Sequence, residues 1–229
     1  MPWKPSPRAV WRPLALSLGM AAIGGTGACT RGTGTPDPVV DHYARHCAVC
    51  HGVDGQTVAG MPAVPLVRGQ GLLALADDAF LRASIADGRP GENGRSKPGT
   101  KMSAFHADRR GPFDDAEIDA LVAYMRAWQT APSIPLDAAW RTDGDPEAGR
   151  VRYQADCASC HGEDGWGEAA PRLAGQTLQA AASDDFLRQT ILRGRPGTAM
   201  LAFDYSAVTV ADVVAFIRTL GPDPGAGGG

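Results

Sequence analysis

The chain has few aromatic residues, no excess of basic charge and no apolar run long enough to cross a membrane. Aromatic residues make up 7% of its 229 residues, and cysteine occurs only five times. The formal net charge is −3 at pH 7, so there is no electrostatic case for binding nucleic acid, and no segment reaches the length of a transmembrane helix. With so few aromatic side chains, a small domain would lack an ample core unless a bound group supplied its centre.

Four of the five cysteines lie in two Cys-x-x-Cys-His motifs. The motifs are Cys47-Ala48-Val49-Cys50-His51 and Cys157-Ala158-Ser159-Cys160-His161. This motif is the attachment signature of a c-type haem, because two thiols add to the vinyl groups of one porphyrin and the adjacent imidazole binds the iron. The sequence therefore predicts two haem c groups, attached through the four cysteines, with His51 and His161 as iron ligands.

Two other interpretations of the cysteines must be weighed. Two Cys-x-x-Cys pairs can build a four-cysteine zinc site, and a single pair can form a redox-active disulfide. Neither explains a histidine directly after both pairs. A thioredoxin-like motif also expects a strand-rich context, whereas the segments after these motifs predict helices and Gly/Pro loops.

The chain is a tandem duplication, because several short motifs recur in the same order. The matched pairs are Pro65-x-x-x-Gly69-Gln70 with Pro171-x-x-x-Gly175-Gln176, Asp78-Ala79-Phe80-Leu81-Arg82 with Asp184-Asp185-Phe186-Leu187-Arg188, Gly88-Arg89-Pro90 with Gly194-Arg195-Pro196, Gly99-Thr100-x-Met102-x-Ala104-Phe105 with Gly197-Thr198-x-Met200-x-Ala202-Phe203, and Tyr124-Met125-Arg126 with Phe216-Ile217-Arg218. Copy one also carries an insertion from Gly91 to Pro98. Each copy is predicted to contain a helix leading into the cysteine motif, a loop, a middle helix around Phe80 or Phe186, a methionine loop and a final amphipathic helix.

The final helix of each copy has the clearest pattern. Asp114 and Asp115 precede a predicted helix from Ala116 to Gln129, and Thr209 is predicted to open the last helix. Their expected inner faces are Ile118, Leu121, Val122, Met125 and Trp128 in copy one, and Val210, Val213, Val214 and Ile217 in copy two. Residues 131–144 show little periodicity and are predicted to link the copies, and residues 222–229 are predicted to form a disordered tail.

These residues resemble class I, mitochondrial-type cytochrome c domains, here in tandem over residues 38–130 and 145–221. The resemblance implies an all-α fold of two domains, each a few helices wrapped around a covalently attached haem. It is closer in copy two, where Gly149-x-x-x-Tyr153 precedes the cysteine motif. Copy one keeps Tyr43 but has Val39 in place of that glycine, so its helix crossing is expected to be wider.

The resemblance assigns the second axial iron ligands to Met102 and Met200. A thioether is a soft ligand that favours ferrous iron and raises the reduction potential, which suits an electron carrier. Methionine also fills gaps in cores. However, only Met102 and Met200 recur in the same Gly-Thr-x-Met-x-Ala-Phe setting.

Residues around the ligands are expected to orient them. A proximal histidine normally donates its other ring N–H to a fixed acceptor, and the resemblance suggests the carbonyl groups of Pro65 and Pro171 for this role. Both prolines also fit ordinary loops. Arg89 and Arg195 could each meet a haem propionate, with ordinary exposed arginines as the alternative.

The first 29 residues are typical of an export signal, because basic residues precede a short apolar stretch and then small residues. The basic residues are Lys4, Arg8 and Arg12. Thr26-Gly27-Ala28-Cys29 resembles the end of a bacterial lipoprotein signal with an acylated cysteine, although Thr26 replaces the usual leucine. The alternative is a cut near Cys29 that leaves a free thiol. We expect an exported, periplasmic protein, either free or tethered to a membrane through residues 30–37.

Histidine and methionine on both irons would leave no coordination position for a substrate, so the predicted function is single-electron transfer. We expect a dihaem cytochrome that takes electrons from a quinol-oxidising complex or dehydrogenase and delivers them to a terminal reductase or oxidase. It would act as a shuttle or as a complex subunit, and its methionine loop resembles that of cytochrome subunits attached to haem-copper oxidases. The alternative is a dihaem redox enzyme, a peroxidase or sulfur-compound oxidoreductase, with one open or switchable haem.

Two features of copy one make this alternative worth testing. The insertion from Gly91 to Pro98 has no counterpart in copy two, and His106 could replace Met102 on the iron in some state.

Basic residues also gather around the Met102 loop, which predicts either docking of an acidic redox partner or a solvated basic loop. They are Arg89, Arg95, Lys97, Lys101, Arg109 and Arg110. His42 and His46 are predicted to be surface residues.

Overall fold

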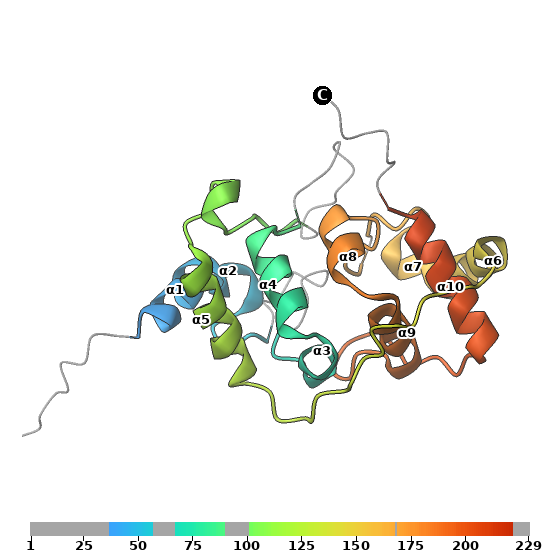
Figure 1. Ribbon diagram of the computed structural model, residues 1–229, viewed down its shortest axis with the longest axis horizontal. Helices are drawn as coiled ribbons and strands as arrows, with labels where there is room; N and C mark the ends of the chain where they lie inside the picture. Colours follow the sequence, from blue (N-terminus) through green and yellow to red (C-terminus); the bar gives the residue numbers. More distant parts are fainter. Residues whose placement is uncertain (1–36, 57–66, 90–100, 168, 222–229) are drawn as a thin grey trace, which may run out of the picture. The chain divides into compact units, whose positions relative to one another are not determined.

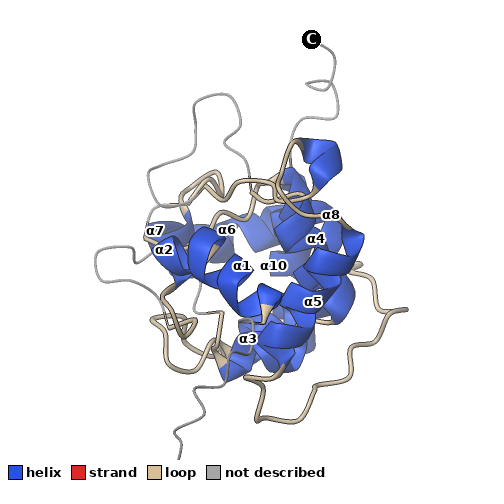
Figure 2. Ribbon diagram, turned by 90° about the vertical axis from the view of Figure 1, so that its left-hand side faces the viewer, coloured by secondary structure: helices blue, strands red, loops and turns tan. Residues whose placement is uncertain are grey.

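The computed structural model describes residues 37–56, 67–89, 101–167 and 169–221. Within these ranges the regular elements are all helices (Figure 2), apart from two isolated β-bridges. The predicted all-α fold class is confirmed. All described residues belong to one compact unit, Thr35–Gly229. None of the helices in these ranges combines the length and the apolar character that a membrane span needs.

Several predicted features lie outside the described residues. They are Cys29 and most of the tether at 30–37, Pro65, the insertion Gly91 to Pro98 with its basic residues, and the tail at 222–229.

The two copies contain the same α-helices in the same order, and copy one has in addition a short 3-10 helix (Figure 1). Copy one has α1 (Pro38–His46), α2 (Ala48–His51), α3 (Gln70–Leu75), α4 (Asp78–Ala86), the 3-10 helix η1 (Ala107–Arg109) and α5 (Asp115–Arg126). Copy two has α6 (Pro146–Asp156), α7 (Ala158–His161), α8 (Gln176–Ala181), α9 (Asp184–Arg193) and α10 (Ala207–Thr219). The sequence predicts α1, α4, α5 and their counterparts α6, α9 and α10. The other helices are too short to show a period in the sequence.

A capping box starts α5 at Asp115. Asp114 Oδ1 accepts a hydrogen bond from the Glu117 amide, and Glu117 Oε2 accepts one from the Asp114 amide, both at 2.9 Å. This reciprocal pair satisfies two amide groups that would otherwise lack partners at a helix start. The helix ends at Arg126, short of the predicted Gln129.

The last helix, α10, begins earlier than the sequence predicts. Ser206 Oγ accepts a hydrogen bond from the Thr209 amide at 3.1 Å, which makes Ser206 the N-cap and Ala207 the first helical residue. The prediction that Thr209 opens this helix was wrong, because Thr209 already lies in its first turn. The predicted inner faces of both final helices are buried, with Trp128 only half-buried beyond the end of α5.

Helix α6 packs on α10 more extensively than α1 packs on α5. A Cβ atom at Gly149 in α6 would lie 1.9 Å from the carbonyl oxygen of Asp212 in α10. Only glycine therefore permits this close crossing. The wider crossing expected from Val39 in copy one agrees with the looser packing of α1 on α5.

Two matched arginines tie the last helix of each copy to its middle region. Arg126 in α5 and Arg218 in α10 each donate hydrogen bonds to one aspartate and two backbone carbonyl groups. In copy one the acceptors are Asp78 (2.6 Å), Leu73 (2.7 Å) and Ala76 (2.5 Å). In copy two they are Asp184 (2.6 Å), Gln179 (2.9 Å) and Ala182 (2.5 Å). These bonds join segments that lie far apart in the sequence.

The segment at 131–144 is bonded to both copies. The Ile134 amide donates to the Ala74 carbonyl in copy one at 2.7 Å, and the Asp137 amide donates to Asp185 Oδ2 in copy two at 2.7 Å. Tertiary hydrogen bonds therefore position this segment, although its sequence shows no regular element.

The two copies contact each other through matched elements, in what we call the seam. Helix α4 packs on α8 and helix α3 packs on α9, where α3 and α4 of copy one correspond to α8 and α9 of copy two. Phe80 and Phe186, which occupy the same position in the repeat, stack with ring centroids 4.5 Å apart. Both rings are buried. The seam therefore approximates a two-fold contact, in which each copy offers the same surface.

Candidate functional site

Both cysteine motifs lie on a short helix that follows directly after a longer one. The Cys47 amide donates to the Tyr43 carbonyl at 2.9 Å where α1 ends, and the Cys157 amide donates to the Tyr153 carbonyl at 2.8 Å where α6 ends. The remaining motif residues form α2 and α7. Cys160 is exposed and the other three motif cysteines are partly buried. This helical turn places both thiols and the histidine of each motif within one local unit.

A tyrosine anchors each motif from the preceding helix. The Tyr43 hydroxyl donates to the Gly52 carbonyl at 3.0 Å, and the Tyr153 hydroxyl donates to the Gly162 carbonyl at 2.8 Å. Both glycines follow the motif histidine, with φ of 75° and 83°. Burial raises the pKa of both tyrosines above their usual range, so each hydroxyl stays protonated and able to donate.

The proximal histidine of copy two has a fixed orientation. Its Nδ1 lies 2.8 Å from the Pro171 carbonyl oxygen, the acceptor that the cytochrome c resemblance suggests. Burial lowers the pKa of His161, while the bond to Pro171 acts in the opposite direction. Burial thus favours the neutral imidazole, which can bind iron through Nε2. The corresponding Pro65 of copy one lies outside the described residues.

Both methionine loops are bonded to the Gly-Arg-Pro step at the end of the middle helix. The Arg89 amide donates to the Met102 carbonyl at 2.7 Å, and the Arg89 carbonyl accepts from the Met102 amide at 3.0 Å. The Arg195 amide donates to the Met200 carbonyl at 2.9 Å. The Phe that ends each methionine motif also bonds to the middle helix, with the Phe105 and Phe203 amides each donating at 3.1 Å.

Glycine permits this close approach in both copies. A Cβ atom at Gly88 would lie 2.3 Å from the Ser103 carbonyl oxygen, and one at Gly194 would lie 2.6 Å from the Ala202 amide nitrogen. Both glycines have positive φ, 62° and 63°, which other residues rarely adopt. The matched Gly88 and Gly194 therefore let the methionine loops approach the middle helices, a role that the sequence does not reveal.

Arg89 and Arg195 lie at the seam, each with its guanidinium group near an aromatic ring. Arg89 Cζ is 5.8 Å from the Phe80 ring centroid, and Arg195 Cζ is 5.3 Å from that of Phe186. Burial lowers the pKa of each arginine to about 10, and the charge of Arg172 adds to the effect at Arg89. None of the described carboxylates lies within ion-pair distance of either group.

The histidines outside the motifs take part in packing. His42 stacks on Phe113 with centroids 4.9 Å apart, and His46 meets Phe113 edge-on at 5.1 Å. Both are half-buried, so they lie at the surface as predicted only in part and also pack on an aromatic ring. Phe113 is itself buried, so one side of each imidazole ring lies against the core.

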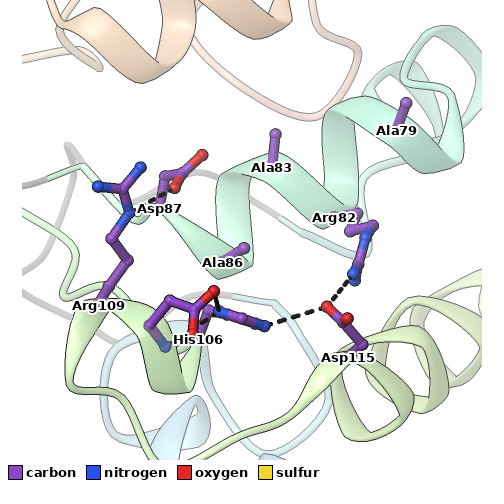
Figure 3. Close-up of a pocket in the computed structure, with 9 residues that line it drawn as sticks. Ala79, Arg82, Ala83, Ala86, Asp87, His106, Arg109 and Asp115 are labelled. Atoms are coloured by element: carbon purple, nitrogen blue, oxygen red, sulfur yellow. Dashed lines mark hydrogen bonds and ion pairs between the residues drawn. The ribbon is translucent and has the colours of Figure 1, made fainter.

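His106 lies in an open surface pocket of about 430 Å³ between α4 and α5 (Figure 3). Its Nε2 is 3.0 Å from Asp115 Oδ1, and its Nδ1 accepts a hydrogen bond from the Asp108 amide at 3.2 Å. Arg82 pairs with the same Asp115 carboxylate. Both ring nitrogens of His106 are therefore engaged, which disfavours the hypothesis that it replaces Met102.

The basic cluster around the Met102 loop is smaller than the sequence suggests. Arg89 belongs to the seam, and Arg109 pairs with Asp87 at 3.2 Å (Figure 3). Lys101 and Arg110 are exposed. The two remaining members of the cluster, Arg95 and Lys97, lie outside the described residues.

The donor set of each copy fits a c-type haem better than the alternatives. In the described part of the chain, no three His, Cys, Asp or Glu side chains gather closely enough to hold a metal ion, so the two cysteine pairs do not combine into one zinc site. The four described cysteines are not in disulfides. What each copy does present is two thiols, an adjacent imidazole and a methionine loop.

Comparison with known proteins identifies both copies. A family model described as "Cytochrome c" matches residues 39–129, and one described as "Cytochrome C oxidase, cbb3-type, subunit III" matches residues 144–217. The chain is a tandem cytochrome c protein. It carries two covalently bound c-type haems.

The relatives belong to one kind of oxidase subunit. The chain is 26% identical over 200 residues to a Cbb3-type cytochrome c oxidase subunit CcoP of Azospirillum sp. (strain B510), an alignment that covers 79% of this chain and 60% of the relative. It is 28% identical over 180 residues to a Cbb3-type cytochrome c oxidase subunit FixPc of Rhizobium leguminosarum bv. viciae, covering 77% of this chain and 58% of the relative. The chain thus spans about 60% of the length of these relatives.

A solved structure shares the fold. It is a chain of the Kuenenia stuttgartiensis reducing HAO-like protein complex Kustc0457/Kustc0458, with a TM-score of 0.50 and 16% sequence identity. The match covers 81% of this chain and 96% of that chain. At this identity the likeness shows the fold alone.

Proposed function

We propose that this protein passes single electrons from a quinol-oxidising complex or dehydrogenase to a terminal reductase or oxidase. His51 and Met102 would bind one haem iron, and His161 and Met200 the other. The observation that carries the proposal is the matched construction of the two copies, each with its cysteine motif on a short helix and its methionine loop bonded to the Gly-Arg-Pro step. Each haem would supply a reversible one-electron couple, whose potential methionine ligation raises.

The residues of the chain would hold and orient the two groups. The Pro171 carbonyl would keep the His161 ring in place, and Pro65 would do the same for His51. Arg89 and Arg195 would receive propionate carboxylates, since their guanidinium groups are buried at the seam without a described carboxylate partner. With both axial positions filled by protein side chains, the protein would act as an electron carrier and not as an enzyme.

The relatives support an oxidase as the electron acceptor. Their names describe subunits of cbb3-type cytochrome c oxidases, and the model that matches copy two bears a related description. We therefore favour a cbb3-type oxidase over a terminal reductase as the partner. The protein would meet it either as a free shuttle or as a subunit of the complex.

The proposed location is the periplasm. The support comes from the sequence, in which the first 29 residues are typical of an export signal. Acylation of Cys29 would tether the protein to a membrane face, and a Cys29→Ser variant would then move to the soluble fraction. A variant that fractionates with membranes as the parent does would contradict the lipid anchor.

The test of the proposed function is the far-red absorption of the fully ferric protein, measured against total haem. A weak band in this region reports a bond between ferric iron and methionine sulfur. We expect two equivalents per chain, one lost in Met102→Ala and the other in Met200→Ala. One equivalent or none in the parent would indicate an open or switchable haem, as in the dihaem redox enzymes considered above.

A further inference from the structure

The two-fold match of the seam breaks down at Gly71. Gly71 in α3 corresponds to Thr177 in α8, because each follows the glutamine of the Pro-x-x-x-Gly-Gln motif. A Cβ atom at Gly71 would lie 2.7 Å from Pro196 Cδ and 3.5 Å from Arg195 Cα. Gly71 thus forms a notch that receives the Arg195-Pro196 corner of copy two, and a residue with a side chain would not fit there without movement of the corner.

The arginine of this corner also bonds across the seam. Arg195 Nη1 donates to the Gly71 carbonyl oxygen at 2.7 Å, and Nη2 donates to Thr190 Oγ1 within copy two at 3.0 Å. The matched Arg89 behaves differently, since its Nη2 lies 3.4 Å from Ser84 Oγ of its own copy. Among the described residues, the Gly-Arg-Pro step is therefore bonded across the seam from copy two to copy one and not in the reverse direction.

The same arginine organises the Met200 loop. Its amide donates to the Met200 carbonyl at 2.9 Å. Its carbonyl accepts from the Thr198 hydroxyl at 2.7 Å, and Thr198 Oγ1 in turn accepts from the Met200 amide at 3.1 Å. A displacement of Arg195 would therefore reach both backbone groups of Met200 through short hydrogen bonds. The exposed loop residues, such as Leu201, offer little packing to resist it.

We propose that the Gly71 notch and the Arg195-Pro196 corner form a latch through which copy one positions Met200. Gly71, Arg195 and Pro196 are then positioning residues for the copy-two haem. This inference rests on the proposed function, because it requires Met200 to bind the iron. Since methionine ligation favours ferrous iron, a closed latch raises the reduction potential of the copy-two haem and leaves that of copy one unchanged.

The test is the full-length dihaem protein with Gly71→Ala, in which the added Cβ pushes against Pro196. The measurements are the far-red band and the two midpoint potentials, assigned to each haem with Met102→Ala and Met200→Ala. We expect partial loss of the Met200 contribution to the band and a roughly tenfold shift of the copy-two haem towards the ferric form, which is about 59 mV for a one-electron couple. The copy-one signals should stay as in the parent.

A compensating variant separates the latch from general damage to α3. In Gly71→Ala/Pro196→Ala the atom nearest to the new Cβ is gone, and the remaining neighbours lie at ordinary contact distance of 3.5 Å. We expect this double variant to recover the parent band and potential. Gly221→Ala serves as a matched control, because a Cβ there meets nothing closer than 3.6 Å; it should leave both haems unchanged.

A second pair of variants tests the latch without relying on Gly71→Ala to fold. Arg195→Gln removes the bond across the seam, whereas Arg89→Gln removes a contact within copy one. If Arg195 is part of the latch, Arg195→Gln should weaken the far-red band of the copy-two haem. Arg89→Gln should weaken that of the copy-one haem by less. Equal effects, or an unchanged Met200 signal in Gly71→Ala, would overturn the latch while leaving methionine ligation intact. Absence of a Met200 band from the parent would overturn the ligation and the latch together.

Discussion

At the scale of single residues, the two copies repeat their contacts with small differences in burial. Tyr153 is fully buried and its hydroxyl bond to Gly162 lies inside the protein, whereas the bond from Tyr43 to Gly52 is only partly buried. A hydrogen bond removed from a buried acceptor costs more than one that water can replace. The two tyrosines should therefore contribute unequally to the stability of their motifs.

We expect Tyr153→Phe to lower the free energy of unfolding by about 1–2 kcal/mol, because the Gly162 carbonyl loses its partner in a buried setting. Tyr43→Phe should cost less. Denaturant unfolding of the haem-loaded protein measures both. Tyr124→Phe is the control, since no described residue accepts a hydrogen bond from that hydroxyl. A Tyr153→Phe variant as stable as the Tyr124→Phe variant would contradict this account.

At the scale of helices, charged side chains hold the last helix of each copy against the middle one. Arg218 is three-quarters buried and its partner Asp184 is nearly enclosed, with exposed side-chain fractions of 25% and 11%. The pair also carries the hydrogen bonds to Gln179 and Ala182. An isolated aspartate left in such a place would be costly.

Replacement of Arg218 by glutamine should destabilise the protein by about 2 kcal/mol, the order expected when hydrogen bonds to a charged group are lost. Arg193→Gln is the matched control, because Arg193 is exposed and, among the described residues, its side chain bonds only to Gln189 within the same helix. It should change the unfolding free energy by less than about 0.5 kcal/mol. Thermal or urea unfolding measures the difference, and similar values for both variants would count against the role of Arg218.

The contact between α4 and α5 should depend on pH through Asp115. The hydrogen bond and charge of Arg82, with a smaller effect from His106, lower the pKa of Asp115 below its unfolded value. A lowered pKa in the folded state means that the pair stabilises the protein above the unfolded pKa of about 3.9 and that this contribution is lost as pH falls through the folded pKa. The parent should therefore exceed Asp115→Asn in stability near neutral pH.

Urea unfolding of the parent and Asp115→Asn over a pH series measures this difference. We expect the gap between the two to close as the solution becomes more acidic, and to be smaller near neutral pH in an Arg82→Gln background. Added salt should also reduce it, because the pair is exposed to solvent. A gap independent of pH would show that Asp115 acts through α5 capping or packing and not through its charge.

At the scale of the whole molecule, the seam makes the two copies one unit. Phe80 and Phe186 are buried against each other, and the segment at 131–144 is bonded to both copies. Copies joined only by a loose linker would unfold independently, whereas a buried apolar contact couples their unfolding. The coupling should therefore depend on the aromatic pair.

Truncation of this pair should separate the two unfolding events. We expect Phe186→Ala to cost about 3 kcal/mol, as large-to-small changes in cores do, and to replace one transition by two. Haem absorbance and far-UV circular dichroism measured together would resolve them. Phe203→Ala is the control, because Phe203 packs beside Tyr205 in the methionine loop and lies only half-buried. A single transition in Phe186→Ala would show that other contacts couple the copies.

The sequence predicted the residues of the site better than the helices and contacts that hold these residues in place. The cysteine motifs, the two methionine loops and the inner faces of the final helices can all be read from short patterns. The start of α10 was misplaced, because Ser206 and Thr209 are both good capping residues and only the bond to the Thr209 amide distinguishes them. Helices α3 and α8 were missed because six residues are too few to show a period.

Haem attachment can be read from the sequence, because it is covalent chemistry on side chains that are close together in the chain. The duplication can be read as well, because matched motifs recur in the same order. The seam, the arginine bonds and the notch at Gly71 required the folded chain. Their partners lie far apart in the sequence and share no period, since Arg195 meets Gly71 of the other copy and Arg126 meets Asp78. Such contacts depend on how helices pack, which local patterns do not specify.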